Sequence, residues 1–179
     1  MDTLLMAAKP HAIEEAARLL KNGQVVAIPT ETVYGLAANA LDSKAVSRIF
    51  EAKGRPQDNP LIVHIADMAM LPSVAREVTE DAKKLAEAFW PGPLTLVLPR
   101  SDKLAKEVSA GLDTVGVRMP AHKEGRAVIR AAGVPLAAPS ANISGSPSPT
   151  TARHVMADMN SRIPMVLDGG GSVVGVEST

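Results

Sequence analysis

Short apolar runs alternate with amphipathic helical segments along this chain, and this alternation limits its fold more than any other feature. The apolar runs predict strands at residues 3–7, 24–28, 61–66, 94–98, 115–119, 136–138, 165–167 and 173–176. Periodic apolar residues between them predict helices at residues 10–22, 43–53, 67–76, 79–89, 124–132 and 150–159. Strands that alternate with helices indicate an α/β fold, and the irregular spacing with adjacent final strands favours a mixed sheet over a wholly parallel one.

Capping residues mark several of these helix ends. Asp42 and Thr79 stand just before predicted helices and are of the residue types that can accept hydrogen bonds from the first turn, so each predicts an N-cap. Gly54 and Gly133 are typical of the position just beyond the last turn of a helix. In residues 79–89 the apolar spacing predicts an inward face made of Ala82, Leu85, Ala86 and Phe89.

The composition excludes several classes of functional site. The 179 residues suffice for one domain with a full-sized core, and none of them is cysteine, which excludes thiol catalysis, disulfides and cysteine-ligated metals. Lysine plus arginine equals aspartate plus glutamate at 19 each, so no overall field attracts nucleic acid or membrane. Aromatic residues make up only 2% of the chain, which argues against binding single-stranded RNA by base stacking.

The two ends of the chain lead to expectations about location and completeness. The first residues carry an acid at position 2 and lack the apolar core of a signal peptide. No apolar run approaches the roughly 20 residues of a membrane span, so we expect a cytoplasmic protein. The chain stops at the sequence EST without a closing element, so we expect a single domain over residues 1–179 that is truncated at its C-terminus.

Polar groups cluster between residues 29 and 64, at the ends of predicted strands and helices. Lys53 and Arg55 stand at the end of the helix predicted for residues 43–53, and Pro56 and Pro60 stiffen the loop that follows. Cations at this position can simply complement the helix dipole. Held rigidly together, however, a lysine and an arginine also suit a phosphate, so this stretch predicts one wall of an anion-binding cleft.

A second group of polar residues follows the strand predicted for residues 136–138. Ser140 and Asn142 lie in a loop of small polar residues, where an ordinary turn and a phosphate or ribose site are both compatible with the composition. Arg118 lies inside a predicted strand, where it faces either solvent or a bound carboxylate. Thr32 and Ser178 offer hydroxyl groups to the same small ligand.

Several familiar site motifs are missing. The chain has no P-loop sequence, its three consecutive glycines at 169–171 do not form a dinucleotide fingerprint, and it has no nucleophile elbow. His64 is more typical of a structural histidine, and no second histidine lies at metal-ligand spacing from it. We therefore expect no zinc or other protein-held metal site.

Six motifs, taken together and in order, resemble the YrdC-like family. They are PTETVYGL at 29–36, KGRP at 53–56 with NPL at 59–61, PGPLT at 91–95, VRMP at 117–120, PSAN at 139–142 with SG at 144–145, and EST at 177–179. The resemblance runs from about residue 10 to the end of the chain. It implies a twisted, mostly mixed open sheet flanked by helices, with a concave, positively charged cleft. Family members usually continue beyond the last motif with further strands, and some carry a second domain.

The resemblance also implies a reaction and a set of site residues. The reaction joins L-threonine, bicarbonate or carbon dioxide, and ATP into threonylcarbamoyl-AMP and pyrophosphate, with Mg²⁺ as cofactor. The product serves the modification of tRNA adenosine 37 through downstream threonylcarbamoyl-transfer proteins, and tRNA or double-stranded RNA is a further partner to consider. By position, ATP would be bound by Lys53, Arg55, Asn59, Thr114, Ser140, Asn142 and Ser148, of which Lys53 and Arg55 would be catalytic. Threonine would be bound by Thr32, His64, Arg118, Ala138 and Ser178.

Two other functions remain open at this point. The cleft could instead bind double-stranded RNA through phosphates without catalysis, although the neutral net charge and scarce aromatic residues count against this. The chain could also be the related domain of a hydrogenase-maturation carbamoyltransferase, but it lacks the cysteine-rich zinc segments that accompany that domain.

Overall fold

The computed structural model describes residues 1–179 as strands, α-helices and two short 3-10 helices. The strands are β1 (Leu4–Ala7), β2 (Val26–Ile28), β3 (Gly35–Asn39), β4 (Val63–His64), β5 (Leu96–Pro99), β6 (Thr114–Arg118), β7 (Leu136–Ala137) and β8 (Met165–Asp168). The α-helices are α1 (Pro10–Lys21), α2 (Ser43–Lys53), α3 (Leu71–Val74), α4 (Glu80–Phe89), α5 (Lys123–Ala132) and α6 (Ala152–Met159). The 3-10 helices are η1 (Met68–Met70) and η2 (Lys106–Ser109). None of these helices has the length and apolar character needed to cross a lipid bilayer.

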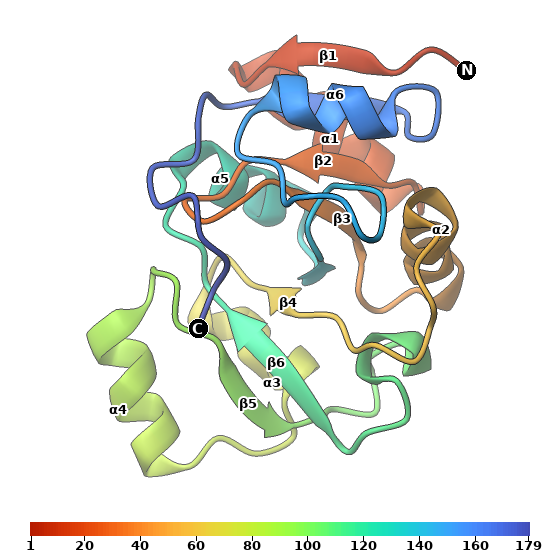
Figure 1. Cartoon of the computed structure of the whole chain (residues 1–179). Helices are drawn as coiled ribbons and strands as arrows, with labels where there is room; N and C mark the ends of the chain where they lie inside the picture. Colours follow the sequence, from red (N-terminus) through yellow and green to blue (C-terminus); the bar gives the residue numbers. More distant parts are fainter.

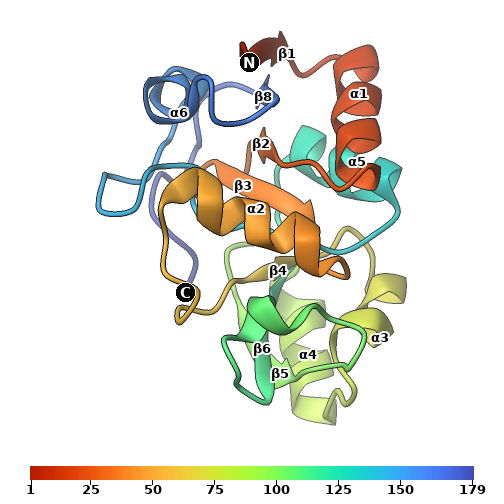
Figure 2. The same ribbon diagram turned by 90° about the vertical axis from the view of Figure 1, so that its right-hand side faces the viewer.

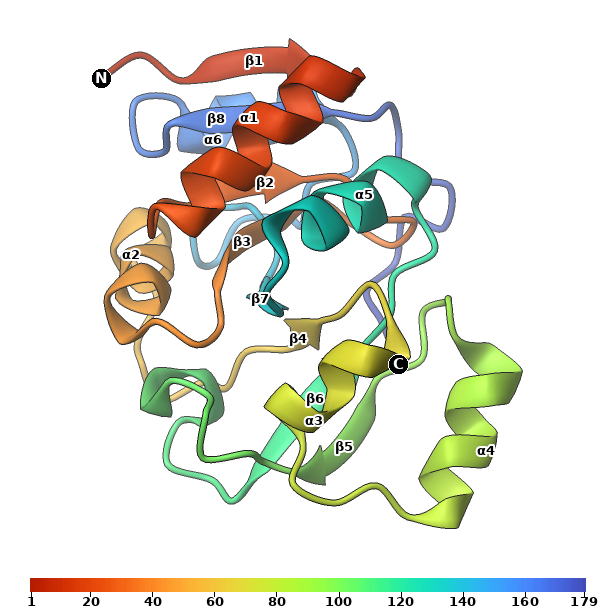
Figure 3. The same ribbon diagram turned by 180° about the vertical axis from the view of Figure 1, so that it is seen from behind.

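All eight strands form one mixed sheet, in the order β1-β8-β2-β3-β7-β4-β6-β5 (Figure 3). β8 pairs in parallel with β1 and β2, and β4 pairs in parallel with β6. The other neighbouring strands are antiparallel. The predicted α/β class and mixed sheet are therefore confirmed. The crossovers bring β4 next to β7, so that segments far apart in the sequence meet in the middle of the sheet.

Helices cover both faces of the sheet, and two cores result. Figure 3 shows α1 and α5 lying together across one face, and Figure 2 shows α6 on the opposite side. Val26 and Ile28 of β2 belong to the core under α1 and α5, whereas Ala27 belongs to the larger core that includes α2 and α6. Successive residues of a strand point to opposite faces, so an all-apolar strand such as β2 is the expected result of burial on both sides.

The predicted helix caps are confirmed. The Asp42 carboxylate accepts hydrogen bonds from the backbone N–H groups of residues 44 and 45, and the Thr79 hydroxyl accepts from that of residue 82. Gly54 and Gly133 follow α2 and α5 in the left-handed conformation, with φ of 62° and 71°. Glycine reaches this conformation without the steric penalty of a Cβ atom, which explains why both helices end where they do.

The strand predictions needed three corrections. β3 was not predicted, because its sequence, GLAAN, has no β-branched or aromatic residue to mark it. The strand predicted for residues 61–66 is paired only at 63–64. The strand predicted for residues 173–176 is wrong, since these residues form an irregular segment whose valines are exposed. Whether each of these segments forms a strand therefore depends more on backbone pairing with a neighbouring strand than on the pattern of its side chains.

The inward face predicted for α4 is only half correct. Ala82 and Ala86 are buried, but Leu85 and Phe89 are 43% and 55% exposed. Figures 1 and 3 show α4 at the rim of the molecule, where no further layer covers its outer side. The helix is held through its two alanines, and the larger apolar residues lie at the edge of that contact.

Candidate functional site

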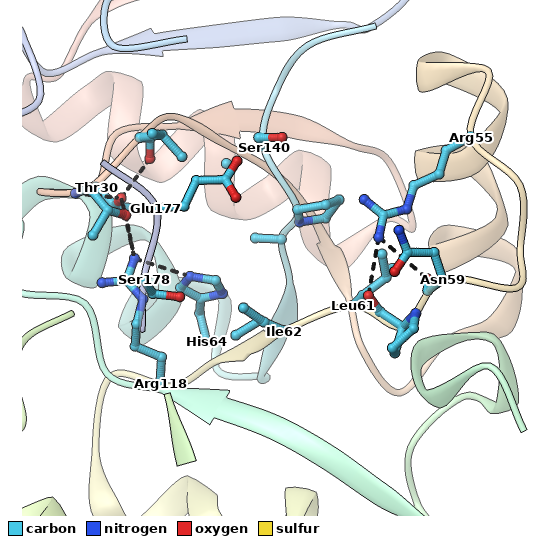
Figure 4. Close-up of a pocket in the computed structure, with 16 residues that line it drawn as sticks. Thr30, Arg55, Asn59, Leu61, Ile62, His64, Arg118, Ser140, Glu177 and Ser178 are labelled. Atoms are coloured by element: carbon cyan, nitrogen blue, oxygen red, sulfur yellow. Dashed lines mark hydrogen bonds between the residues drawn. The ribbon is translucent and has the colours of Figure 1, made fainter. Parts of the chain in front are cut away.

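A cleft of about 310 Å³ lies where several strand ends meet (Figure 4). Its walls come from the loop after β2, the segment that leads into β4, the end of β6 and the loop after β7. Glu177 and Ser178, near the C-terminal end of the chain, also line it. Five separate parts of the sequence thus face one space, at strand ends of the kind where α/β folds bind ligands.

One wall carries Arg55, Asn59 and Ser140. The Arg55 guanidinium donates hydrogen bonds to the backbone carbonyls of Asn59 (3.4 Å) and Pro60 (3.2 Å). These bonds hold the guanidinium against its own loop, at the end of the cleft opposite Thr30 and Arg118 in Figure 4. Ser140 reaches the same space from the loop after β7. The wall therefore presents a cation, an amide and a hydroxyl, which suits the oxygen atoms of a phosphate.

Lys53 lies behind this wall and does not line the cleft. Its residue is 2% exposed, and its ammonium donates hydrogen bonds to the backbone carbonyls of Ser140 and Asn142, the latter at 2.7 Å. Burial, and then the charge of Arg55, lower the pKa of Lys53 to about 8. The segments 53–55 and 140–142, both of which the family resemblance assigned to ATP, therefore meet through a lysine whose ammonium binds the backbone of the loop.

The opposite wall is built around the buried guanidinium of Arg118. Its Nη1 donates to the carboxylate of Glu31, and its Nη2 donates to the hydroxyls of Thr32 (3.1 Å) and Thr30 (3.3 Å). The other Glu31 oxygen accepts from the backbone N–H of Ala121. Arg118 thus faces the cleft rather than solvent. A buried charge requires a partner, and Glu31 is that partner.

His64 completes this wall as a neutral side chain. Its Nε2 lies 3.4 Å from Nη2 of Arg118, and because a guanidinium only donates, this nitrogen accepts and the ring proton lies on Nδ1. Burial, and then the positive charge of Arg118, lower the pKa of His64 to about 3. No group of three or more His, Cys, Asp or Glu side chains in the structure could hold a metal ion by itself.

Most of the residues predicted from the sequence line this one cleft. They are Arg55, Asn59 and Ser140 of the ATP set and Thr32, His64, Arg118, Ala138 and Ser178 of the threonine set. Four predicted residues lie outside the lining. Lys53 and Asn142 are behind the wall, Ser148 donates a hydrogen bond to Glu177, and Thr114 is exposed at the start of β6. The roles of all these residues stay predictions.

Three residues of the site were given no role in the sequence analysis. Thr30 and Glu31 bind Arg118, and Glu177 lines the cleft beside Ser178. Each stands within a motif that was identified, one or two residues from a predicted ligand. Glu177 also directly follows residues 173–176, which were wrongly predicted as a strand. Their closeness in sequence to predicted ligands was therefore the signal that could have identified these three residues.

Residues 169–179 form a C-terminal strap, of which Glu177 and Ser178 line the cleft. At its start, the buried Tyr34 hydroxyl donates to the carbonyl of Gly170 (2.6 Å), and burial raises the pKa of Tyr34 to about 12. In its middle, the N–H of Val174 donates to a carbonyl of the loop after β2 (2.8 Å). At its end, the hydroxyls of Ser178 and Thr95 are hydrogen-bonded at 2.9 Å. The strap is irregular but is held at both ends and in the middle.

The family model Sua5_yciO_yrdC, described as "Telomere recombination", matches residues 18–179. The threonylcarbamoyl-AMP synthase of Pyrococcus abyssi is 58% identical over 167 residues, which cover 93% of this chain and 49% of that protein. The threonylcarbamoyl-AMP synthase of Bacillus subtilis is 56% identical over 168 residues, with coverages of 93% and 49%. The crystal structure of P. abyssi Sua5 complexed with L-threonine has a TM-score of 0.96 at 53% identity, covering 100% of this chain and 53% of that one. The chain spans about half the length of these relatives.

Proposed function

Because the chain belongs to the Sua5/YciO/YrdC family, we propose that it acts as a nucleotidyltransferase that forms threonylcarbamoyl-AMP. Its substrates in this proposal are L-threonine, bicarbonate or carbon dioxide, and ATP, with Mg²⁺ as cofactor, and its second product is pyrophosphate. The product would be passed in the cytoplasm to proteins that modify adenosine 37 of tRNA. Similarity to proteins named threonylcarbamoyl-AMP synthase supports this proposal.

The observation that carries the proposal is that two walls with different chemistry line the same cleft. The wall with Arg55 and Ser140 suits phosphate oxygens, and the wall with Thr32, Arg118 and Ser178 suits the carboxylate and hydroxyl of a small amino acid. A reaction that joins an amino acid to a nucleotide requires both ligands side by side. A cleft lined by both walls meets this requirement.

The proposed reaction requires the protein to position the substrates and to stabilise developing negative charge, and it requires no protein nucleophile. The amine of threonine bonds to the carbon of bicarbonate, a C–O bond of bicarbonate breaks and water leaves, which gives a carbamate. One oxygen of this carbamate attacks the α-phosphorus of ATP. The bond from that phosphorus to its bridging oxygen breaks, and pyrophosphate leaves with the electron pair. Arg55 would stabilise the charge that develops on the phosphates, and bound Mg²⁺ would share that charge. Lys53 would hold the loop of Ser140 in place and add positive charge from behind.

On the amino-acid side, Arg118 would attract the carboxylate of threonine, while Glu31 holds the guanidinium in place. The hydroxyls of Thr32 and Ser178 would complete the polar contacts. His64 is neutral, and its Nε2 is already occupied by Arg118, so it would shape the pocket rather than carry a proton.

The test is to incubate the chain with ATP, bicarbonate and each amino acid in turn, and to follow pyrophosphate. We expect release with threonine, and a loss of about 100-fold in Arg55→Ala, the range for removing one charge-stabilising group. Arg130→Ala, an exposed arginine of α5, is the matched control and should keep full activity. Release that is equal with and without an amino acid would refute the proposal.

Two control arms address the rival functions. An RNA-binding module would bind double-stranded RNA with an affinity that falls steeply with salt and ignores threonine. A carbamoyltransferase domain would depend on carbamoyl phosphate instead of bicarbonate. Neither result is expected.

A further inference from the structure

Glu177 is the only acidic residue that lines the cleft. The other nearby carboxylate, that of Glu31, lies behind the wall, and both of its oxygens are occupied by Arg118 and Ala121. Glu177 makes one hydrogen bond, which its Oε1 accepts from the hydroxyl of Ser148. Its second oxygen is free to take a further partner.

The surroundings of Glu177 are those of the phosphate wall. Figure 4 shows its carboxylate in the cleft, directed towards Ser140. Its carboxylate forms no ion pair with Arg55 or Lys53, because no oxygen of Glu177 lies within 4.0 Å of a nitrogen of either side chain. Its charge nevertheless acts on both cations, because it raises the pKa of each against the lowering caused by burial. The carboxylate is therefore near the two cations without being neutralised by either.

A carboxylate in this position conflicts with a bound polyphosphate. Two groups of negative charge a few ångströms apart repel each other, and the repulsion is stronger in a partly buried cleft than in water. Arg55 can offset charge on the phosphates, but it forms no ion pair with Glu177, and its hydrogen bonds to the carbonyls of Asn59 and Pro60 hold it against its own loop, so the carboxylate itself stays unpaired. A cation that contacts both the carboxylate and the phosphates removes the conflict.

We propose that Glu177 is a ligand of a divalent cation that bridges its carboxylate and the phosphates of the bound nucleotide. The inference rests on the proposed function, because it needs a nucleotide in the cleft. The donors fit Mg²⁺, which prefers hard oxygen ligands and is usually held by one or two carboxylates, substrate phosphates and water. Since no all-protein metal site exists, the cation enters with the nucleotide. Ser148 orients the carboxylate and selects which oxygen faces the cation.

The test uses Mn²⁺ as the probe, with a non-hydrolysable ATP analogue and the full chain. Analogue affinity is measured by calorimetry with Mn²⁺ and, separately, in EDTA, and bound Mn²⁺ is followed by electron paramagnetic resonance. With Mn²⁺, Glu177→Gln should weaken analogue binding by at least the roughly tenfold that loss of an outer-shell partner costs a metal site. In EDTA the same variant should bind the analogue more tightly than the unmodified chain, because a repulsive charge is gone.

Asp58→Asn is the matched control. Asp58 is exposed, its charge also acts on Arg55, and it does not line the cleft. It should leave both affinities within twofold of the unmodified chain.

Three outcomes would overturn the inference. Equal weakening of Glu177→Gln with Mn²⁺ and in EDTA would make Glu177 a structural residue of the strap. A loss confined to L-threonine binding, with the analogue unaffected, would make it a partner of the amino-acid ammonium group. An unmodified chain that binds no analogue under either condition would defeat the proposed function itself, and the inference with it.

Discussion

Lys53 acts on the cleft through the backbone of another segment. Its ammonium is shared between the carbonyls of Ser140 and Asn142, so it fixes the loop that presents Ser140. Its pKa of about 8 means that it is mostly charged at neutral pH and loses that charge as the pH rises further. The positive field behind the phosphate wall should therefore weaken above pH 8.

This leads to a prediction for Lys53→Met. The variant leaves two carbonyls without their donor, which should lower the free energy of unfolding by about 1–3 kcal/mol. It should also bind a non-hydrolysable ATP analogue about tenfold more weakly, which corresponds to ~1.4 kcal/mol. Calorimetry from pH 7 to pH 9 should show affinity falling in the unmodified chain and a flat profile in the variant. An unchanged pH profile in Lys53→Met would contradict this role.

His64 gives a prediction about acid stability. Its pKa is lowered to about 3 in the folded chain, whereas the unfolded chain takes up the proton near pH 6.5. Between these values the unfolded state binds more protons, so stability falls as the pH falls through this window. At pH 5 this histidine alone should reduce the free energy of unfolding by about 2 kcal/mol relative to pH 7.

The measurement is urea denaturation at pH 7 and pH 5. His64→Gln should lose about 2 kcal/mol less stability between the two values than the unmodified chain does. His11→Gln, at an exposed position of α1, should behave like the unmodified chain. An identical acid response in all three proteins would show that His64 is not held neutral.

At the scale of elements, α5 and the loop after β2 fit together through a glycine. A Cβ atom at Gly125, in the first turn of α5, would collide with the carbonyl oxygen of Pro29. Pro29 directly precedes Thr30 and lies three residues before Thr32, and the hydroxyls of both threonines accept hydrogen bonds from Arg118. The close approach of this helix therefore sets the position of one wall of the cleft.

Gly125→Ala should accordingly affect both stability and binding. We expect it to lower the free energy of unfolding by about 1–3 kcal/mol, as overpacking does, and to weaken L-threonine binding. Arg130→Ala, on the exposed side of α5, should change stability by less than about 0.5 kcal/mol. Unfolding curves measure the change in the free energy of unfolding, and calorimetry measures the change in affinity for L-threonine. If Gly125→Ala changed neither stability nor L-threonine binding, the loop after β2 would have to move freely away from the helix, which would contradict this role.

The elements differ in how far the sequence could predict them. α2 was predictable because its signals are local: Asp42 caps its start, apolar residues repeat along it and Gly54 ends it. β3 and the C-terminal strap were not, because partners elsewhere in the chain fix them. β3 is held by pairing with β2 and β7, and the strap begins at the hydroxyl of Tyr34. Short alanine-rich and valine-rich segments carry no local pattern that reports such partners.

For the whole molecule, the motifs predicted which family the chain belongs to, and the family match confirms this. They also assigned residues of segments 53–55 and 140–142 to the same ATP, and the two segments do meet in the structure. They did not predict that Lys53 would lie behind the wall, or that Arg118 would already be paired with Glu31. Those facts depend on the order β7-β4-β6 in the sheet, which places the ends of three separate strands around one space. The position of Lys53 and the pairing of Arg118 with Glu31 are therefore visible only in the folded structure.

The central claim is that this single space holds the amino acid and the nucleotide side by side. A crystal structure of the chain with L-threonine and a non-hydrolysable ATP analogue tests it most directly. The account predicts threonine against Thr32, Arg118 and Ser178, phosphates against Arg55 and Ser140, and the threonine nitrogen directed towards the α-phosphate. Phosphates bound outside this cleft, or two ligands in separate sites, would contradict it.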